Sequence, residues 1–483
     1  MNLFTFKFLI LISFLITITS CSTPKKSDRQ ATYFGGEIIN PNTNYVVLSK
    51  GYDFRDTIFL DDNNRFIYKI DSLQDGLYSF KHNPESQVVI LEKGDSILIR
   101  LNTIEFDESL VFTGDGARKN NFLIDTYLQN EKERQQLRRV GFKLSPPYFK
   151  NQQDSLLNVK LSSFEKLTKK NSLSNLSKKI TQASFVYDYY TRHEMYFNIK
   201  HDIKGKNAVR DIVSSPFFNY RNLINFNDND IKRLYSYNRF LNFYFANIPL
   251  SNQITENREF ETHFDKTLYK INLIDSLIQH SFIKDNLLRR VTSNFLLNSE
   301  NNLESNKILK RYLLINSDKK SQKELKELAG LISKLRPNNI IPDQDLITSK
   351  GETIKLSSLF NQPITALYFW SMESKKHYER AHNKVQYLKS LHPNIDFIAI
   401  NTDDEQTKNW LKTIKRHHYN LDYEYEFKNS KHASEELLIY YRNKVILVNQ
   451  EGKIINSKAD LFASSFEKQL LYYTTQLTRI AEQ

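Results

Sequence analysis

The chain has 483 residues, of which 40% are hydrophobic and 25% charged, an ordinary globular composition that excludes a largely disordered chain. Its length exceeds the roughly 100 to 200 residues of one typical domain, so we expect two or three domains. The formal net charge is +13, but Lys and Arg alternate with Asp and Glu and form no basic block, which argues against nucleic acid as a partner.

The amino-terminal segment, residues 1–20, has the pattern of a secretory signal. Lys7 precedes an apolar run at residues 8–19, and this run is shorter than the roughly 20 residues that a membrane-spanning helix needs. Residues 18–21, Ile-Thr-Ser-Cys, resemble the bacterial lipobox, which implies a lipid on Cys21. The alternative is an ordinary cleaved signal in which this cysteine is incidental.

Cys21 is the only cysteine of the chain, so its lipidation would leave no free thiol, disulfide or cysteine-based metal site. Residues 21–30 are polar and predict a tether between the lipid and the first domain. No acidic cluster follows the cysteine, and some Gram-negative groups use such a cluster to send lipoproteins outside. We therefore expect a lipid-anchored protein of the bacterial cell envelope that faces the periplasm.

Residues 31–116 alternate between apolar and polar positions, with turn residues every eight to twelve positions, and predict an antiparallel, sandwich-like β-domain. The turns at residues 61–64 and 93–95 contain the Asp, Asn and Gly that turn geometry favours. We interpret residues 114–116, Gly-Asp-Gly, as a plain turn, because this short motif alone does not make a phosphate loop. The predicted strands are residues 45–48, 57–60, 66–70, 88–91, 97–101 and 109–112.

Residues 117–337 change to a helical period and predict an all-α domain. Leu325, Leu328, Ile332 and Leu335 follow the spacing of one buried helix face. The many Tyr and Phe of this region are as expected for core packing, with a ligand groove as the alternative. The predicted breaks between helices are residues 146–147 and 225–230.

Residues 338–483 alternate between strand and helix patterns and predict an α/β domain. A segment with two prolines, residues 336–342, has the composition of a linker. The predicted elements are a buried strand at 364–370, a helix at 374–388, a strand at 395–400, a helix at 403–417, a strand at 423–427, a hairpin at 444–455 that turns at Glu451-Gly452, and a last helix with Phe466, Leu470, Tyr473, Leu477 and Ile480 inward.

Several stretches of this last domain resemble the TlpA-like branch of the thioredoxin-fold disulfide reductases. They are residues 342–359, the strand ALYFW that ends at Trp370, residues 396–403 and residues 445–454. The resemblance covers about 30% of the chain. It implies a thioredoxin-like fold, and the two preceding domains look like the upstream region of many Gram-negative envelope lipoproteins of this type.

The redox motif of that family is missing from the matching positions. The family has a Cys-x-x-Cys motif at a helix N-terminus, where the helix dipole stabilises a thiolate, but this chain has Ser374 and His377. The family also has a cis-proline before the hairpin strand, and Asn443 stands there in this chain. A serine hydroxyl is too weak an acid to replace a thiolate. We therefore assign no catalytic residue and no cofactor.

Ser374 and His377 also permit a different interpretation, a nucleophile and base on the first turn of a helix. A working pair needs an acid to orient the histidine and a site for the oxyanion, and the sequence identifies neither. Ser374 is more simply a helix N-cap whose side chain accepts a backbone hydrogen bond.

Two further clusters invite a chemical interpretation. His417 and His418 suggest a metal site, but adjacent helical residues point about 100° apart and no third ligand is evident at a suitable spacing. Asp403, Asp404 and Glu405 suggest paired carboxylates, but a helix N-terminus with acidic residues in its first turn accounts for them. We assign no metal ligand.

Taken together, the residues predict a membrane-tethered envelope lipoprotein with a redox-inactive thioredoxin-like domain that binds a protein or peptide. The family resemblance leaves two alternatives open. One is an accessory role in a thiol-disulfide pathway, and the other is binding of a hydrophobic or glycan ligand by the helical domain. The missing catalytic cysteines favour a binding protein over an enzyme, and the sequence leaves the oligomeric state open.

Overall fold

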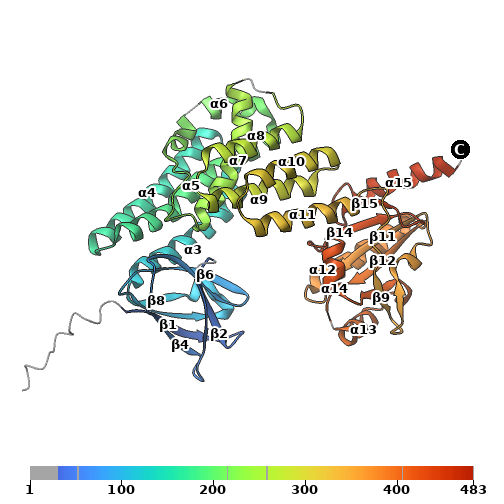
Figure 1. Ribbon diagram of the computed structural model, residues 1–483, viewed down its shortest axis with the longest axis horizontal. Helices are drawn as coiled ribbons and strands as arrows, with labels where there is room; N and C mark the ends of the chain where they lie inside the picture. The colour runs from blue at the N-terminus through green and yellow to red at the C-terminus, as the bar shows by residue number, and fades with distance from the viewer. Residues whose placement is uncertain (1–30, 52–53, 215, 257–258, 405, 482–483) are drawn as a thin grey trace, which may run out of the picture. The chain divides into compact units, whose positions relative to one another are not determined.

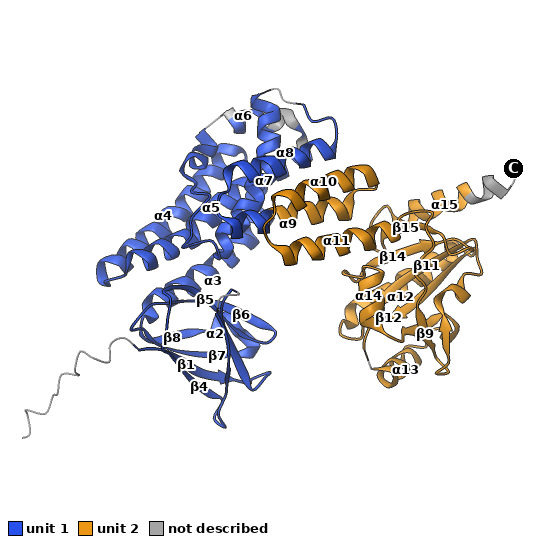
Figure 2. Cartoon of the chain, in the orientation of Figure 1, with its two compact units in different colours: residues 1–287 blue, residues 288–483 orange. Residues whose placement is uncertain are grey.

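The computed structural model describes residues 31–51, 54–214, 216–256, 259–404 and 406–481. The signal, the tether and Cys21, all within residues 1–30, lie outside the described residues, and so does Glu405. The chain divides into two compact units, residues 1–287 and residues 288–483 (Figure 2). Each unit is described by itself below.

The first unit begins with a sandwich of two four-stranded sheets, in the orders β4-β1-β7-β8 and β3-β2-β5-β6 (Figure 1). Alternate side chains of both sheets point into one core, which includes Phe34, Val46, Phe80 and Ile97. The strands are β1 (Thr32–Ile39), β2 (Tyr45–Lys50), β3 (Phe54–Phe59), β4 (Arg65–Ile70), β5 (Gly76–His82), β6 (Glu85–Leu91), β7 (Ser96–Asn102) and β8 (Val111–Asp115).

The sandwich confirms the predicted β-rich first domain but differs from the prediction in three details. β1 and β7 pair in parallel, whereas the sequence pattern predicted antiparallel pairing throughout. The strands β1 and β5 were not predicted, because β1 carries the adjacent Gly35 and Gly36 and glycine disfavours strands. β8 begins at Val111, since the short helix α2 (Phe106–Ser109) occupies the start of the predicted strand 109–112.

The predicted turn at residues 114–116 is only partly correct. Gly114 lies in β8 with a φ of 90°, and a Cβ there would meet the carbonyl oxygen of Ser96 at 2.0 Å. Only Gly116, with a φ of 92°, turns the chain into the next helix.

The rest of the first unit is helical, as predicted. The breaks predicted at residues 146–147 and 225–230 are confirmed, since the first is the start of α4 and the second is a turn before α7. Ile274 and Ile278 are fully buried. The helices are α3 (Ala117–Arg139), α4 (Pro146–Lys170), α5 (Asn175–Lys204), α6 (Lys206–Ser214), α7 (Tyr235–Thr255) and α8 (His263–Leu277), and α9 (Ser281–Asn298) runs across the division between the units.

A buried ion cluster joins the sandwich to the helices within the first unit. The Lys119 ammonium of α3 lies 2.6 Å from Glu92 and 2.7 Å from Asp95, at the turn between β6 and β7. The hydroxyl of Ser177 in α5 also donates to Glu92, at 2.7 Å. Because a buried charge needs compensating partners, this cluster fixes the helices against one end of the sandwich.

The second unit contains a seven-stranded sheet in the order β10-β9-β13-β12-β11-β14-β15. β11, β12 and β13 run parallel, and β14 and β15 form the predicted antiparallel hairpin, which turns at Gly452 with a φ of 75°. The strands are β9 (Asp345–Thr348), β10 (Thr353–Lys355), β11 (Ile364–Trp370), β12 (Ile395–Asn401), β13 (Glu424–Phe427), β14 (Lys444–Val448) and β15 (Ile454–Asp460).

Helices cover both faces of this sheet, and neighbouring residues of each strand point to opposite faces. In β11, Leu367 and Phe369 pack in one core, whereas Tyr368 and Trp370 pack in the other. The helices of this unit are α10 (Asn302–Ile315), α11 (Lys319–Lys334), α12 (Lys375–Leu391), α13 (Thr407–Arg416), α14 (Ser430–Glu436) and α15 (Phe466–Ala481). Of the predicted inward residues of the last helix, Phe466 and Leu470 are buried.

The predicted linker at residues 336–342 is part of the packed unit. The backbone N–H of Asn338 donates to the carbonyl oxygen of Ile454, and that of Ile341 donates to the carbonyl oxygen of Gly452. The segment therefore lies along the β14–β15 hairpin. Ile332 and Leu335 of the predicted stripe pack in the same core as the sheet. The predicted boundary at 337/338 stays a prediction about domains, while the contacts group α10 and α11 with the sheet.

Candidate functional site

Two parallel strands at the centre of the sheet, β11 and β12, end side by side, with Trp370 opposite Asn401. Asp403 fixes the loops that follow them. Its carboxylate accepts a hydrogen bond from Ser371 Oγ at 2.5 Å and from the backbone N–H of Met372 at 2.7 Å. Because Asp403 is buried and makes these bonds, it holds the two loops together at the carboxyl edge of the sheet.

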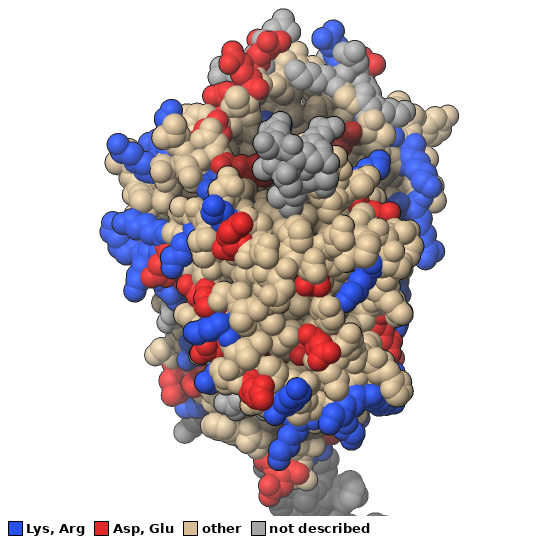
Figure 3. Space-filling view, turned by 90° about the vertical axis from the view of Figure 1, so that its right-hand side faces the viewer, with Lys and Arg blue, Asp and Glu red and all other residues tan. Residues whose placement is uncertain are grey.

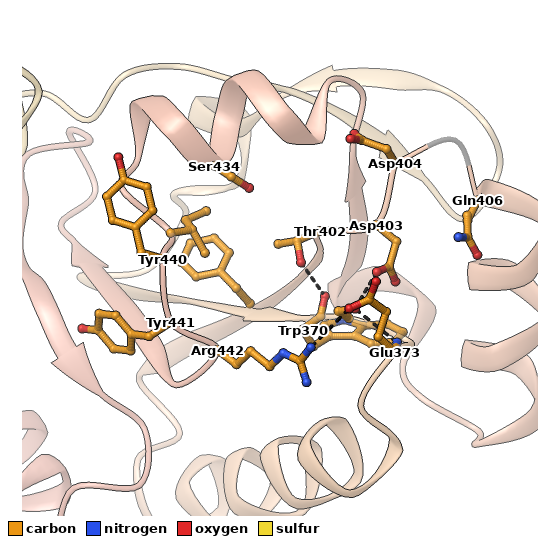
Figure 4. A pocket seen from close by; sticks show the side chains of 13 residues that line it. Trp370, Glu373, Thr402, Asp403, Asp404, Gln406, Ser434, Tyr440, Tyr441 and Arg442 are labelled. Atoms are coloured by element: carbon orange, nitrogen blue, oxygen red, sulfur yellow. Dashed lines mark hydrogen bonds and ion pairs between the residues drawn. The ribbon is translucent and has the colours of Figure 1, made fainter. Parts of the chain in front are cut away.

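A cavity of about 520 Å³ lies at this edge, and we call it the strand-end cavity. Figure 4 shows Tyr440 and Tyr441 on the opposite side of the cavity from Gln406. Arg442 extends towards Glu373, and its Nη2 lies 3.2 Å from Glu373 Oε2. The lining therefore combines aromatic rings with both signs of charge.

The predicted motif positions adjoin this cavity, because Ser374 follows Glu373 and Asn443 follows Arg442 in the chain. His377 Nε2 lies 3.2 Å from Asn443 Oδ1, so the fold brings together two positions that are 66 residues apart. The Ser374 side chain makes no hydrogen bond with His377 among the described residues. The geometry thus links His377 to Asn443 and offers no Ser374–His377 dyad.

The environment of His377 favours its neutral form. Burial lowers the pKa of His377, and the cations Arg442 and Arg380 lower this pKa further, while the hydrogen bond to Asn443 opposes them. Its Nδ1 is buried and has no hydrogen-bond partner. At neutral pH the ring therefore donates from Nε2 to the Asn443 amide oxygen, in the tautomer that carries its proton there.

The structure corrects the predicted role of Ser374. It is the N-cap residue of α12, but its side chain makes no capping hydrogen bond, and only its backbone carbonyl accepts from the N–H groups of His377 and Tyr378. With a φ of −125° and a ψ of 81°, the residue lies outside the extended geometry that a capping side chain normally uses.

The predicted acidic first turn at residues 403–405 is also wrong. α13 begins at Thr407, with Gln406 as its N-cap, so Asp403 and Asp404 precede the helix. The sequence pattern placed the start of this helix too early. The carboxylate of Asp403 accepts hydrogen bonds from Ser371 and Met372 and does not lie in the first turn of a helix.

The two adjacent histidines point to different surroundings. His417 is the C-cap of α13, and its Nε2 lies 3.3 Å from the Tyr378 hydroxyl. His418 has a φ of 55° and so lies beyond the helix. No group of three or more His, Cys, Asp or Glu residues that could hold a metal ion occurs within the described ranges.

A histidine and a glutamate are buried in contact with each other behind α12. His382 Nε2 lies 2.8 Å from Glu424 Oε1 of β13, and the His382 ring stacks on Tyr419 with ring centroids 3.7 Å apart. Burial raises the pKa of Glu424, and the hydrogen bond from His382 only partly offsets this effect. This pair lies in the core rather than in the lining of the strand-end cavity.

The surface in Figure 3 shows how the positive net charge is distributed on one face. Blue Lys and Arg side chains and red Asp and Glu side chains are interspersed there, separated by uncharged residues. This face therefore carries no field of a single sign. In the part of the chain that the structure describes, no helix has the length and apolar character to cross a membrane.

Residues 362–454 of the second unit, from just before β11 to the first residue of β15, match a family model described as thioredoxin-like. The chain carries a thioredoxin-like domain. The match and the strand order together support this assignment, and they confirm the predicted fold of the last region. No curated protein was found to match the chain.

Among solved structures, a thiol-disulfide oxidoreductase from Bacteroides fragilis is 19% identical and covers 28% of this chain and 98% of its own, with a TM-score of 0.24. The thioredoxin domain of a thiol-disulfide oxidoreductase from Bacteroides vulgatus is 16% identical, covering 29% and 98%, with a TM-score of 0.25. A thioredoxin-like protein from Bacteroides caccae is 14% identical, covering 59% and 93%, with a TM-score of 0.32.

Among the residues that line the strand-end cavity and that sequence reasoning missed are Glu373, Tyr440, Tyr441 and Arg442. Each is a direct or near neighbour of a motif position that was identified. A signal was present, because residues next to an active-site motif usually face the same groove. These residues line the same cavity because β11 pairs with β14, and this pairing cannot be seen in the sequence.

Proposed function

We propose that the thioredoxin-like domain binds an extended polypeptide segment in the strand-end cavity and performs no thiol-disulfide chemistry. The observation that carries this proposal is the hydrogen bond between His377 and Asn443 beside an open cavity of about 520 Å³. These two residues stand where the family resemblance places the second cysteine and the cis-proline.

The absence of thiols supports the redox-inactive part of the proposal. Cys21 is the only cysteine in the sequence, and it lies more than 300 residues before β11. Dithiol exchange needs an attacking thiolate and a second thiol that resolves the mixed disulfide. Neither Ser374 nor His377 can form the sulfur–sulfur bond that this exchange requires.

The lining of the cavity supports a peptide as ligand. Tyr440 and Tyr441 offer rings with polar tips, which bury a large contact area at a low cost in conformational entropy. Arg442 and Glu373 are both exposed and only loosely paired, so they can exchange their contact for polar groups of a ligand. Such a mixed surface is typical of protein recognition and unlike a closed apolar pocket.

The test is site-specific photo-crosslinking in the bacterial envelope. A photo-reactive amino acid at Gln406, which is exposed and lines the cavity, should capture a specific polypeptide. Ser434→Arg, which fills the cavity from α14, should abolish that adduct. The same reactive group at Ser464, exposed and outside the lining, is the matched control. Equal adducts at Gln406 and Ser464, or adducts that survive Ser434→Arg, would refute peptide binding in this cavity.

Insulin reduction with dithiothreitol tests the redox-inactive part separately. The purified protein should not exceed the uncatalysed rate. A rate above that background, lost in a variant at Ser374 or His377, would overturn the proposal.

We also propose that a lipid on Cys21 tethers the protein to the cell envelope on the periplasmic side. The apolar run before this cysteine and the lack of other cysteines support this anchor. Cys21→Ser should move the protein from the membrane fraction to the soluble fraction and remove the label from radioactive fatty acid. Ser22→Ala is the matched control, and a membrane association that Cys21→Ser leaves intact would exclude the lipid anchor.

A further inference from the structure

A second cavity lies in the second unit and shares Tyr440 and Tyr441 with the lining of the strand-end cavity. Its volume is about 390 Å³, and apolar side chains of α9, α11 and the segment before β14 form most of its wall. We call it the lysine pocket, because two lysines stand among these apolar groups. Its lining includes Leu297, Leu335, Leu438, Tyr441, Lys444 and Lys458.

Lys444 is the unusual residue of this pocket. It is 5% exposed, and its ammonium donates to the carbonyl oxygens of Leu437 at 2.9 Å and Leu438 at 3.1 Å. An ammonium has three N–H groups, so one of them has no acceptor among the described residues. No carboxylate of the described chain forms an ion pair with Lys444, although lysine is rarely buried without such a partner.

The two carbonyl bonds give Lys444 a structural role at the end of α14, but they do not neutralise its charge. Carbonyl oxygens carry only partial negative charge, and a buried cation normally has an anionic partner. Elsewhere in this chain the buried ammonium groups of Lys119 and Lys160 each contact a carboxylate. Lys444 thus lacks the carboxylate that Lys119 and Lys160 contact.

Lys458 stands at the rim of the same pocket. Its ammonium donates to the Ser299 carbonyl oxygen at 3.3 Å, and the nearby charges that act on it are those of Glu300, Arg336 and Lys444. Burial, with a contribution from Lys458, lowers the pKa of Lys444 to about 8. An anion bound between the two ammonium groups would compensate the buried charge of Lys444 and reduce its repulsion with Lys458.

We propose that the lysine pocket binds a small amphipathic carboxylate, with its acid group on Lys444 and Lys458 and its alkyl chain against Leu297, Leu335 and Leu438. The volume lies in the range of small-ligand pockets, and a few polar groups among apolar walls are typical of them. A fatty-acid-type ligand meets both demands, since one end supplies the missing negative charge and the other replaces water at the apolar wall.

The test is calorimetric titration of the full chain with sodium dodecanoate below its micelle concentration. Cys21→Ser is used as the background so that no acyl chain of the protein competes. Dodecanoate should bind with a stoichiometry of one, and dodecan-1-ol, with the same tail and no charge, should bind at least about tenfold more weakly. Acetate should show no measurable binding, because it lacks the tail.

Lys444→Met and Lys458→Met should each weaken dodecanoate binding about tenfold or more, since each removes a charge-assisted hydrogen bond. Lys453→Met, an exposed lysine on the same hairpin, is the matched control and should leave binding unchanged. If Lys444→Met unfolds the domain, Lys458→Met at the rim carries the test. Equal affinity for dodecanoate and dodecan-1-ol, or unchanged binding in Lys458→Met, would overturn the proposal.

The pH dependence provides a readout that a structural lysine would not give. Dodecanoate affinity should fall as the pH rises from 7 to 9.5, because Lys444 loses its proton as the pH passes about 8. This fall should be smaller in Lys444→Met, where Lys458, whose pKa burial also lowers, remains in the site. A fall of the same size in that variant would assign the effect to other groups and remove Lys444 from the site.

Discussion

Two glutamates in different parts of the molecule show how a partner decides the state of a buried carboxylate. Glu133 lies in α3 of the first unit, and Glu424 lies in β13 of the thioredoxin-like domain. Both are buried, and each has one carboxylate oxygen without a hydrogen-bond partner. They differ in the cations that face the other oxygen.

Glu133 contacts two basic side chains, with Oε2 lying 2.6 Å from the Lys160 ammonium and 2.7 Å from Arg192 Nη1. Arg192 also pairs with Asp188 at 2.7 Å, so the charges form a closed network between α3, α4 and α5. Glu424 instead faces His382, which is charged only when protonated. The comparison teaches that the helical network is a structural connection, whereas burial raises the pKa of the Glu424 carboxyl behind α12.

The largest expected effect comes from removing the carboxylate of the closed network. Glu133→Ala leaves Lys160 buried without the carboxylate that it contacts, while Arg192 keeps its pair with Asp188, and we expect the free energy of unfolding to fall by about 3–5 kcal/mol. Far-UV circular dichroism in urea measures this change. Fluorescence follows the second unit alone, because both tryptophans, Trp370 and Trp410, are buried there, and its transition should move less.

Glu131→Ala is the matched control on the same helix. Glu131 pairs with Arg134 at 2.6 Å, but its side chain is 46% exposed, so we expect a loss of at most about 0.5 kcal/mol. Similar losses for both variants would show that the network stabilises no more than a surface pair does.

We expect Glu424→Gln to change the free energy of unfolding by a smaller amount, and this change depends on pH. Burial raises the pKa of Glu424 above its ordinary value of 4.5, so the folded domain holds a proton that the unfolded chain releases. Stability contributed by this group is therefore present below pH 4.5 and is lost as the pH rises towards the raised pKa. The scale is about 1.4 kcal/mol for each unit by which the pKa is raised.

The measurement is urea unfolding by tryptophan fluorescence between pH 4.5 and pH 6.5, with wild type and Glu424→Gln compared at each pH. The wild type should lose stability relative to the variant as the pH rises. A relative gain of wild-type stability would mean that Glu424 is ionised and stabilised by His382, which contradicts the contrast with Glu133.

Local patterns were good predictors of strands and helices but poor predictors of partners. The run at residues 364–370 predicted β11 because a strand covered on both faces is almost entirely apolar, and here Thr365 is the exception. β1 was not predicted because it contains two adjacent glycines, which have a low strand propensity. Propensity does not take into account the neighbouring strands that pair with β1. Asp403 was assigned to a helix dipole because its hydrogen-bond donors, Ser371 and Met372, belong to a loop about 30 residues earlier.

The candidate site shows the same division. Ser374, His377 and Asn443 were identified in the sequence because each occupies a position where the resembling family has a characteristic residue. The contact between His377 and Asn443 and the cavity beside them required the fold, since the pairing of β11 with β14 brings the two segments together.

The sequence by itself determined the order of a β-rich, a helical and an α/β region, because hydrophobic periodicity is a local property of the chain. It also determined that no thiol other than Cys21 is present. Only the tertiary structure decided that Lys444 is buried without a carboxylate and that Glu424 faces a histidine. It also decided that residues 336–342 lie along the β14–β15 hairpin. The physical reason is that charge compensation and burial depend on groups far apart in the chain, which only the fold brings into contact.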